Sequence, residues 1–224
     1  MSPEKNDIVL LIGSPAAAKS TSFALGAYLL RRMQAAGKRG VTMMSEALLS
    51  SPAAMAEAAE TIATSELLVV AFPLYVDHLP APLIQVLEEL QPHLEQRAAP
   101  RLAVIVNCGF PENIHNRPAV EIMQHFARRC GMAWAGALTF GQGGFVGGRD
   151  PERLGGMGRH LRQALDEAAA ALAAGREIPP AAVERMARRL MPNWFYTYMA
   201  NRNWRHKAKE NGARREIAAR PYAR

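Results

Sequence analysis

Residues 8–22, IVLLIGSPAAAKSTS, form the stretch that decides the fold of this chain. The five apolar residues at 8–12 predict a strand that is buried on both faces, and Gly13-Ser14-Pro15 ends it abruptly. An amphipathic helix is expected to follow, with an apolar stripe made of Phe23, Ala27, Leu30 and Met33. A buried strand, a tight loop and an amphipathic helix in this order are typical of an α/β fold.

Three hydroxyl side chains gather where this helix is expected to begin, at Ser20, Thr21 and Ser22, directly after Lys19. The first N–H groups of a helix have no partner inside it, and the helix dipole also favours negative charge there, so the pattern indicates a phosphate site. A single hydroxyl at this place would be an ordinary N-cap. Because a cap needs only one such residue, three favour the phosphate site, with the cap as the alternative.

The composition fits a globular protein, with 49% hydrophobic residues in 224. This length suits one α/β domain with an appendage or two small domains. The longest apolar runs are far shorter than the ~20 residues that cross a bilayer, and the polar start MSPEKND lacks the apolar segment of a signal peptide. Two cysteines are too few for a disulfide framework. We therefore expect a cytoplasmic protein without a membrane span.

The net charge of +7 is distributed unevenly along the chain. Residues 176–224 contain 12 Lys and Arg against 4 Asp and Glu, whereas residues 1–175 contain 15 against 16. The positive charge therefore belongs to the C-terminal part alone, and the high isoelectric point does not make the whole protein a nucleic-acid binder. We expect a domain over 1–175 and a basic, aromatic extension over 176–224.

The rest of the chain repeats the order of strand and helix. Further strands are expected at 41–44, 67–72, 102–106 and 134–140. Helices are expected at 53–63, from about 80, from about 118 to 130, and at 156–174, where Met157, Leu161, Ala164, Leu165, Ala168 and Leu172 have helical spacing. Such alternation predicts a parallel sheet with helices on both faces. Ligands of these sheets bind at the carboxyl ends of the strands, so the loops there are the candidate site.

Several of these loops resemble those of the flavodoxin-like NAD(P)H-dependent FMN reductase family. The resemblance is carried by GSPAAAKSTS after the first strand, PLYVDHLPAPL after the third, NCGFPE after the fourth and GQGG after the fifth. It implies a five-stranded sheet with the order 2-1-3-4-5 and a homodimer in which one subunit completes the other's flavin site. The family commonly has an arginine where this chain has Ala16, and Lys19 is the candidate replacement for that charge.

The resemblance also implies which residues bind FMN. The phosphate would lie against Ser14, Lys19, Ser20, Thr21 and Ser22. The flavin ring would contact Pro73, Leu74, Tyr75 and Val76, and its other edge would meet Asn107, Cys108, Gly109, Phe110, Gly141, Gly143 and Gly144. For Tyr75, the alternative is an aromatic side chain packed in the core at the end of a strand. Cys108 has no evident base partner, so we interpret it as a wall of the pocket and not as a nucleophile.

The tail interleaves aromatic and basic residues in RMARRLMPNWFYTYMANRNWRHKAKENG. Such a pattern can bind a membrane surface or single-stranded nucleic acid. The alternative, which we favour, is that the aromatic side chains pack on the body or on a second subunit while the arginines stay solvated.

Three functions remain open at this point. The first is an FMN-dependent oxidoreductase that passes hydride from NAD(P)H through the flavin to a small acceptor such as a quinone, flavin, nitro or azo compound or ferric chelate, with no catalytic side chain and no metal. The second is a nucleoside-triphosphate-binding protein, because GSPAAAKS is a P-loop pattern with Ala18 in place of the second glycine. The third is a non-enzymatic electron carrier or interaction module.

Overall fold

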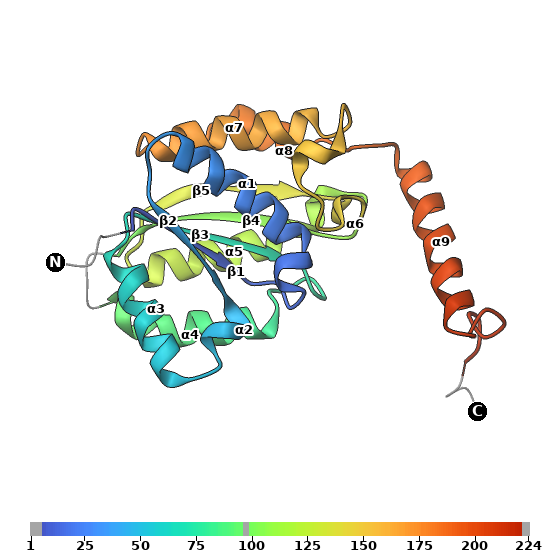
Figure 1. Ribbon diagram of the computed structural model, residues 1–224, viewed down its shortest axis with the longest axis horizontal. Coiled ribbons are helices and arrows are strands. Elements are labelled where there is room, and N and C mark those ends of the chain that lie inside the picture. Colours follow the sequence, from blue (N-terminus) through green and yellow to red (C-terminus); the bar gives the residue numbers. More distant parts are fainter. Residues whose placement is uncertain (1–5, 96–98, 221–224) are drawn as a thin grey trace.

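The computed structural model describes residues 6–95 and 99–220, and its centre is a five-stranded parallel sheet with the order β2-β1-β3-β4-β5 (Figure 1). The strands are β1 (Ile8–Ile12), β2 (Gly40–Met44), β3 (Leu67–Pro73), β4 (Arg101–Asn107) and β5 (Trp134–Phe140). All five residues of β1 are buried, as their unbroken apolar run predicts for a central parallel strand. The flavodoxin-like strand order that the sequence motifs imply is confirmed.

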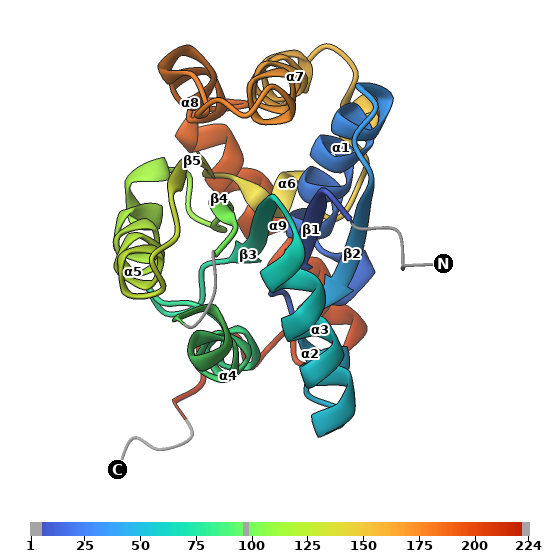
Figure 2. The same ribbon diagram turned by 90° about the vertical axis from the view of Figure 1, so that its left-hand side faces the viewer.

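Two hydrophobic cores lie on the two faces of this sheet. Ile8, Leu10 and Ile12 of β1 point into one core, and Val9 and Leu11 point into the other, as the alternation of side chains along a strand requires. The first core is covered by α1 (Thr21–Ala35), α7 (Arg159–Ala173) and α8 (Pro180–Met186), and the second by α3 (Pro52–Thr64), α4 (Ala81–Glu95) and α5 (Arg117–Arg129) (Figure 2). The short helices are α2 (Ser45–Leu48) and α6 (Gly143–Val146).

The helix predicted at 156–174 begins later than its spacing suggested. Helix α7 starts at Arg159, after a turn in which Gly155 has a φ of +57°. Met157 lies in this turn and is exposed, so its assignment to the buried stripe was wrong. On α1, Phe23 and Ala27 are only half-buried, whereas Leu30 and Met33 of the expected stripe are buried, together with Leu25, Tyr28 and Leu29.

The segment after α7 stays attached to the body. The Ile178 N–H donates to the carbonyl of Ala135 over 2.8 Å, and Ala182 and Met186 of α8 are buried in the core beneath α7 and β5. The chain therefore leaves the compact body only after Met191, later than the division at residue 175 that the charge asymmetry predicts.

Helix α9 (Asn193–Glu210) lies beyond the carboxyl edge of the sheet and stands off from the body (Figure 1). None of its residues is buried, and Trp194 and Trp204 are 73% and 72% exposed. The aromatic residues of this helix therefore do not pack on the described part of the chain's own body, apart from Tyr196. Of the two kinds of packing expected from the sequence, packing on a second subunit stays a prediction. No helix among the described residues combines the length and apolar character needed to cross a bilayer.

Candidate functional site

The loops that leave β1, β3, β4 and β5 meet at the carboxyl edge of the sheet, where backbone hydrogen bonds join them. The Gly13 N–H donates to the backbone carbonyl of Ala71 over 2.9 Å. The N–H groups of Leu74 and Gly143 donate to the backbone carbonyls of Asn107 and Cys108, respectively, each over 2.8 Å. Neighbouring loops are thereby fixed relative to one another. This is the edge at which sheets of this kind bind their ligands.

Ser20 is the N-cap of α1. Its hydroxyl accepts a hydrogen bond from the Phe23 N–H over 3.0 Å and donates one to the Ala17 carbonyl over 2.7 Å. Ala17 itself has a φ of +45°, an uncommon conformation for a residue with a side chain. The capping alternative is therefore confirmed for this one hydroxyl.

The two hydroxyls that follow bond to distant parts of the chain. Thr21 Oγ1 donates to the Gly143 carbonyl over 2.8 Å, and Ser22 Oγ accepts from Asn107 Nδ2 over 2.7 Å. Asn107 also donates to the Phe72 carbonyl over 3.3 Å and is buried. These side chains tie α1 to the ends of β3, β4 and β5. The sequence named Thr21, Ser22 and Asn107 as site residues but gave no sign that they bond within the protein.

The groups still available for an anion in this loop are mainly backbone N–H groups. Those of Ser14, Ala16, Ala18, Thr21 and Ser22 donate to no residue that the structure describes, and the Ser14 hydroxyl has no protein partner there either. Two of these donors belong to the first turn of a 15-residue helix. The loop thus fits a phosphate group through its backbone, and the exposed Lys19 lies beside it.

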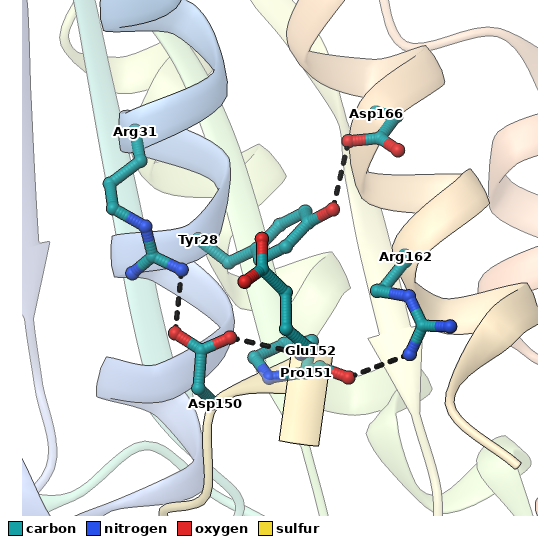
Figure 3. Close-up of polar contacts among 7 residues, drawn as sticks. All are labelled: Tyr28, Arg31, Asp150, Pro151, Glu152, Arg162 and Asp166. Atoms are coloured by element: carbon teal, nitrogen blue, oxygen red, sulfur yellow. Dashed lines mark hydrogen bonds and ion pairs between the residues drawn. The ribbon is translucent and has the colours of Figure 1, made fainter. Parts of the chain in front are cut away.

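The long connection from β5 to α7 packs on α1. A Cβ on Gly148 would lie 2.2 Å from the Lys19 carbonyl oxygen, so only glycine allows this approach. Figure 3 shows polar contacts that fix the connection: Arg31 pairs with Asp150 over 2.6 Å, and Arg162 donates to the Pro151 carbonyl over 2.9 Å. An open cavity of 580 Å³ lies between α1 and this connection, and its lining combines three arginines and two carboxylates with alanine, phenylalanine and glycine residues.

Beside it, Tyr28 of α1 donates to Asp166 of α7 over 3.1 Å (Figure 3). Burial and this hydrogen bond raise the pKa of the Tyr28 phenol. The hydroxyl therefore remains a neutral donor, and it links the two helices that flank the connection.

The loop after β3 presents apolar side chains to solvent. Tyr75 and His78 exchange two backbone hydrogen bonds, of 2.9 and 3.0 Å, around Val76 and Asp77, whose φ values are +49° and +56°. This is the geometry of a type I′ turn, which favours Asn and Gly. Val76 is instead β-branched and 98% exposed, and Tyr75 is 48% exposed. A strained, solvent-facing valine is a feature typical of functional sites.

The loop after β4 combines a buried thiol with an open glycine. Burial raises the pKa of the Cys108 thiol, so the sulfur is protonated at neutral pH, in agreement with its interpretation as a wall and not a nucleophile. Gly109 has free space where a side chain would be. Phe110 is 49% exposed, and its ring lies 4.3 Å from that of His115. A flat ligand can therefore approach the backbone at Gly109.

The glycine-rich loop after β5 packs mainly against the loop after β4. A Cβ on Gly141 would lie 2.9 Å from the Pro111 carbonyl oxygen, and one on Gly143 would lie 2.7 Å from Asn107 Oδ1. These two glycines therefore allow close contact between protein loops. Gly144 faces the hydroxyl of Tyr196 on α9, a residue that the sequence analysis did not place at the site. In the part of the chain that the structure describes, no three potential metal ligands cluster.

Comparisons with known proteins identify structural relatives. No family model matches the sequence, and no curated protein matches it. An NADH:FMN oxidoreductase in its apo form is similar to this chain with a TM-score of 0.58 and 20% identity, over 83% of this chain and 95% of that one. The NAD(P)H:quinone oxidoreductase from Methanothermobacter marburgensis matches with a TM-score of 0.58 and 14% identity, over 75% and 96% of the two chains.

An FMN-dependent NADH-azoreductase from Bacillus anthracis, solved in complex with FMN, has a TM-score of 0.53 and 12% identity to this chain, with 75% and 99% of the two chains covered. These matches are consistent with the family resemblance of the loop motifs. At such identities they establish the architecture: the chain has the flavodoxin-like fold.

Proposed function

We propose that this protein is an FMN-dependent oxidoreductase that passes hydride from NAD(P)H to a small acceptor. The observation that carries the proposal is the pairing of two features on one edge of a flavodoxin-like sheet. Backbone N–H groups that have no partner among the described residues lie at the start of α1, and the exposed apolar side chains of Tyr75, Val76 and Phe110 lie on the neighbouring loops. A site for FMN requires both features, because the N–H groups would bind its phosphate and the apolar side chains would contact its flat ring.

The loop residues have distinct roles in this proposal. The N–H groups of Ser14, Thr21 and Ser22 would hold the phosphate, with Lys19 as the nearby cation. The turn around Val76 would support one face of the ring, and the open backbone at Gly109 would lie at its edge. Bound FMN supplies the redox chemistry, because its ring accepts a hydride from a nicotinamide and passes the electrons to an acceptor. The protein binds and orients, and no side chain has to act as an acid or base.

The acceptor and the assembly state are the finer parts of this proposal. Quinones, flavins, nitro and azo compounds and ferric chelates are the candidate acceptors, with NADH or NADPH as donor. We propose a homodimer as the working form, because Trp194, Tyr198 and Trp204 of α9 are mostly exposed in the described part of the single chain and could be covered by a second copy. Light scattering on the purified protein measures this directly, and a chain ending at Met191 should then be monomeric.

The test of the activity is the visible spectrum of the protein after FMN is added and excess flavin is removed. We expect retained flavin absorbance near ~450 nm that bleaches under nitrogen when NADH or NADPH is added. Retained FMN that neither nucleotide reduces would overturn the enzymatic part and leave an electron carrier. No retained FMN combined with saturable, magnesium-dependent ATP binding would favour the nucleoside-triphosphate alternative.

A further inference from the structure

The segment that leads into α9 is fixed to the candidate site by a buried glutamine. Gln142 is fully buried and has a φ of +59°. Its Oε1 accepts hydrogen bonds from the N–H groups of Leu190 and Met191 over 2.8 and 3.2 Å, and its Nε2 donates to the Met191 carbonyl over 2.8 Å. All three bonds connect the glycine-rich loop after β5 to the start of the tail. The tail therefore leaves the body at a defined place beside the site.

A second contact fixes the first turn of α9. Asn193 Nδ2 donates to Glu112 Oε1 over 2.5 Å, which joins the helix to the loop after β4. Asn193 Oδ1 is buried but has no hydrogen-bond partner among the described residues. The surroundings of Asn193 are therefore enclosed and polar, and one buried oxygen there has no hydrogen-bond partner among the described residues.

Tyr196 lies one turn further along the helix, between the two loops proposed to border the flavin ring. Its hydroxyl donates to the Gly109 carbonyl over 2.9 Å, and a Cβ on Gly144 would lie 3.1 Å from the same oxygen. Burial and the neighbouring Cys108 raise the pKa of this phenol. The hydroxyl is thus a neutral hydrogen-bond donor at physiological pH.

We propose that Tyr196 is a specificity-determining residue, whose hydroxyl hydrogen-bonds the carbonyl or nitro oxygen of a flat electron acceptor. The inference rests on the proposed function and adds the acceptor class to it. In the free protein the Tyr196 hydroxyl donates to the Gly109 carbonyl, and there is open space beside Gly109. An oxygen of the acceptor that enters this space would accept the hydrogen bond in place of the Gly109 carbonyl. Only a hydrogen bond is made, and Tyr196 transfers no proton.

Helical spacing separates Tyr196 from Trp194 and Tyr198 on α9. Trp194 and Tyr198 are two residues away on either side, which places both roughly 160° around the helix. They are exposed, whereas Tyr196 is half-buried. Tyr198 thus has the same chemistry on the same helix without the contact to Gly109, which makes it a matched control.

The experiment compares wild type, Tyr196→Phe and Tyr198→Phe after reconstitution with FMN. Binding of 1,4-naphthoquinone to the oxidised protein, without a nicotinamide, is followed by flavin fluorescence. KM is measured for the same quinone and for ferricyanide, which needs no such hydrogen bond. We expect Tyr196→Phe to weaken naphthoquinone binding and raise its KM about three- to tenfold, the effect of one lost hydrogen bond. FMN affinity, the rate of flavin reduction and the ferricyanide KM should not change, and Tyr198→Phe should match wild type.

The inference is overturned if Tyr196→Phe binds naphthoquinone as wild type does. It is also overturned if the variant loses FMN affinity or ferricyanide turnover by the same factor, because Tyr196 would then only hold the loops together. Failure of the proposed function is recognised earlier and in wild type alone, as a protein that retains no FMN or whose flavin neither NADH nor NADPH reduces. The proposal for Tyr196 falls with it.

Discussion

Beside α1, the hydroxyl side chains at the carboxyl edge of the sheet form hydrogen bonds within the protein, whereas beside β3 and β4 the same edge presents its side chains to solvent. We call the first region (residues 13–22 and 141–150) the closed end and the second (residues 75–78 and 109–110) the open end. At the closed end, Thr21 bonds to Gly143 and Ser22 to Asn107. At the open end, Val76 is almost fully exposed.

This difference shows how each end can bind a ligand. Hydroxyls at the closed end fix the positions of the loops, which leaves backbone N–H groups to meet a phosphate. At the open end the ligand would be met by apolar side chains and an uncovered backbone at Gly109. Substitutions at the closed end should therefore lower stability, and those at the open end should change binding with little loss of stability.

The largest effect is expected from Gly148→Ala at the closed end. Its φ is +77°, and a Cβ would lie 2.2 Å from the Lys19 carbonyl oxygen, so both strain and overlap oppose the change. The free energy of unfolding should fall by about 2–3 kcal/mol in a urea titration. Gly147→Ala is the control, because its φ is also positive but its nearest contact is at 3.5 Å. Equal losses in the two variants would show that the connection does not pack on α1 as described.

A smaller loss is expected from breaking the Asn107–Ser22 hydrogen bond. Asn107→Ala should cost about 2 kcal/mol and Ser22→Ala about 1 kcal/mol, because both side chains are buried and paired. The double variant should lose less than the sum, with a coupling of about 1 kcal/mol in the cycle. Strict additivity in chemical denaturation would contradict the assigned contact.

At the open end, Val76→Asn combined with Asp77→Gly should raise stability. The two positions have the positive φ values of a type I′ turn, for which Asn-Gly is the preferred pair. Relief of the strain should raise the free energy of unfolding by about 1 kcal/mol. The same change removes the exposed valine, so FMN affinity should fall by about threefold. A variant that gains stability and keeps full FMN affinity would remove Val76 from the ring site.

The smallest effect is expected from Cys108→Ala. The thiol is buried and its pKa is raised, so the wild-type sulfur should react with a disulfide reagent only slowly at pH 8. Turnover of the variant should stay within about twofold of wild type. The raised pKa also means that this thiol stabilises the fold below its unfolded pKa and loses that contribution as the pH rises through the folded pKa. A large loss of turnover would indicate chemistry at Cys108.

The sheet was predictable from the sequence because buried parallel strands are unbroken apolar runs, as at 8–12 and 67–72. The partners of the hydroxyls were not, because Ser22 and Thr21 bond to residues 85 and 122 positions away. Met157 shows the limit of periodicity, since its spacing fits the helix but a turn precedes Arg159. In the sequence, Tyr196 is one of several aromatic residues in the tail, and only the folded structure distinguishes it by its contact with Gly109.

The central claim, that this edge binds FMN by its phosphate and its ring, is tested most directly by comparing equilibrium binding of FMN and riboflavin to the purified protein. The account predicts one FMN per chain and at least about tenfold weaker binding of riboflavin, which lacks the phosphate that the N–H groups at the start of α1 would hold. Equal affinities for the two flavins would contradict the role of the closed end. No saturable binding of either would contradict the account as a whole.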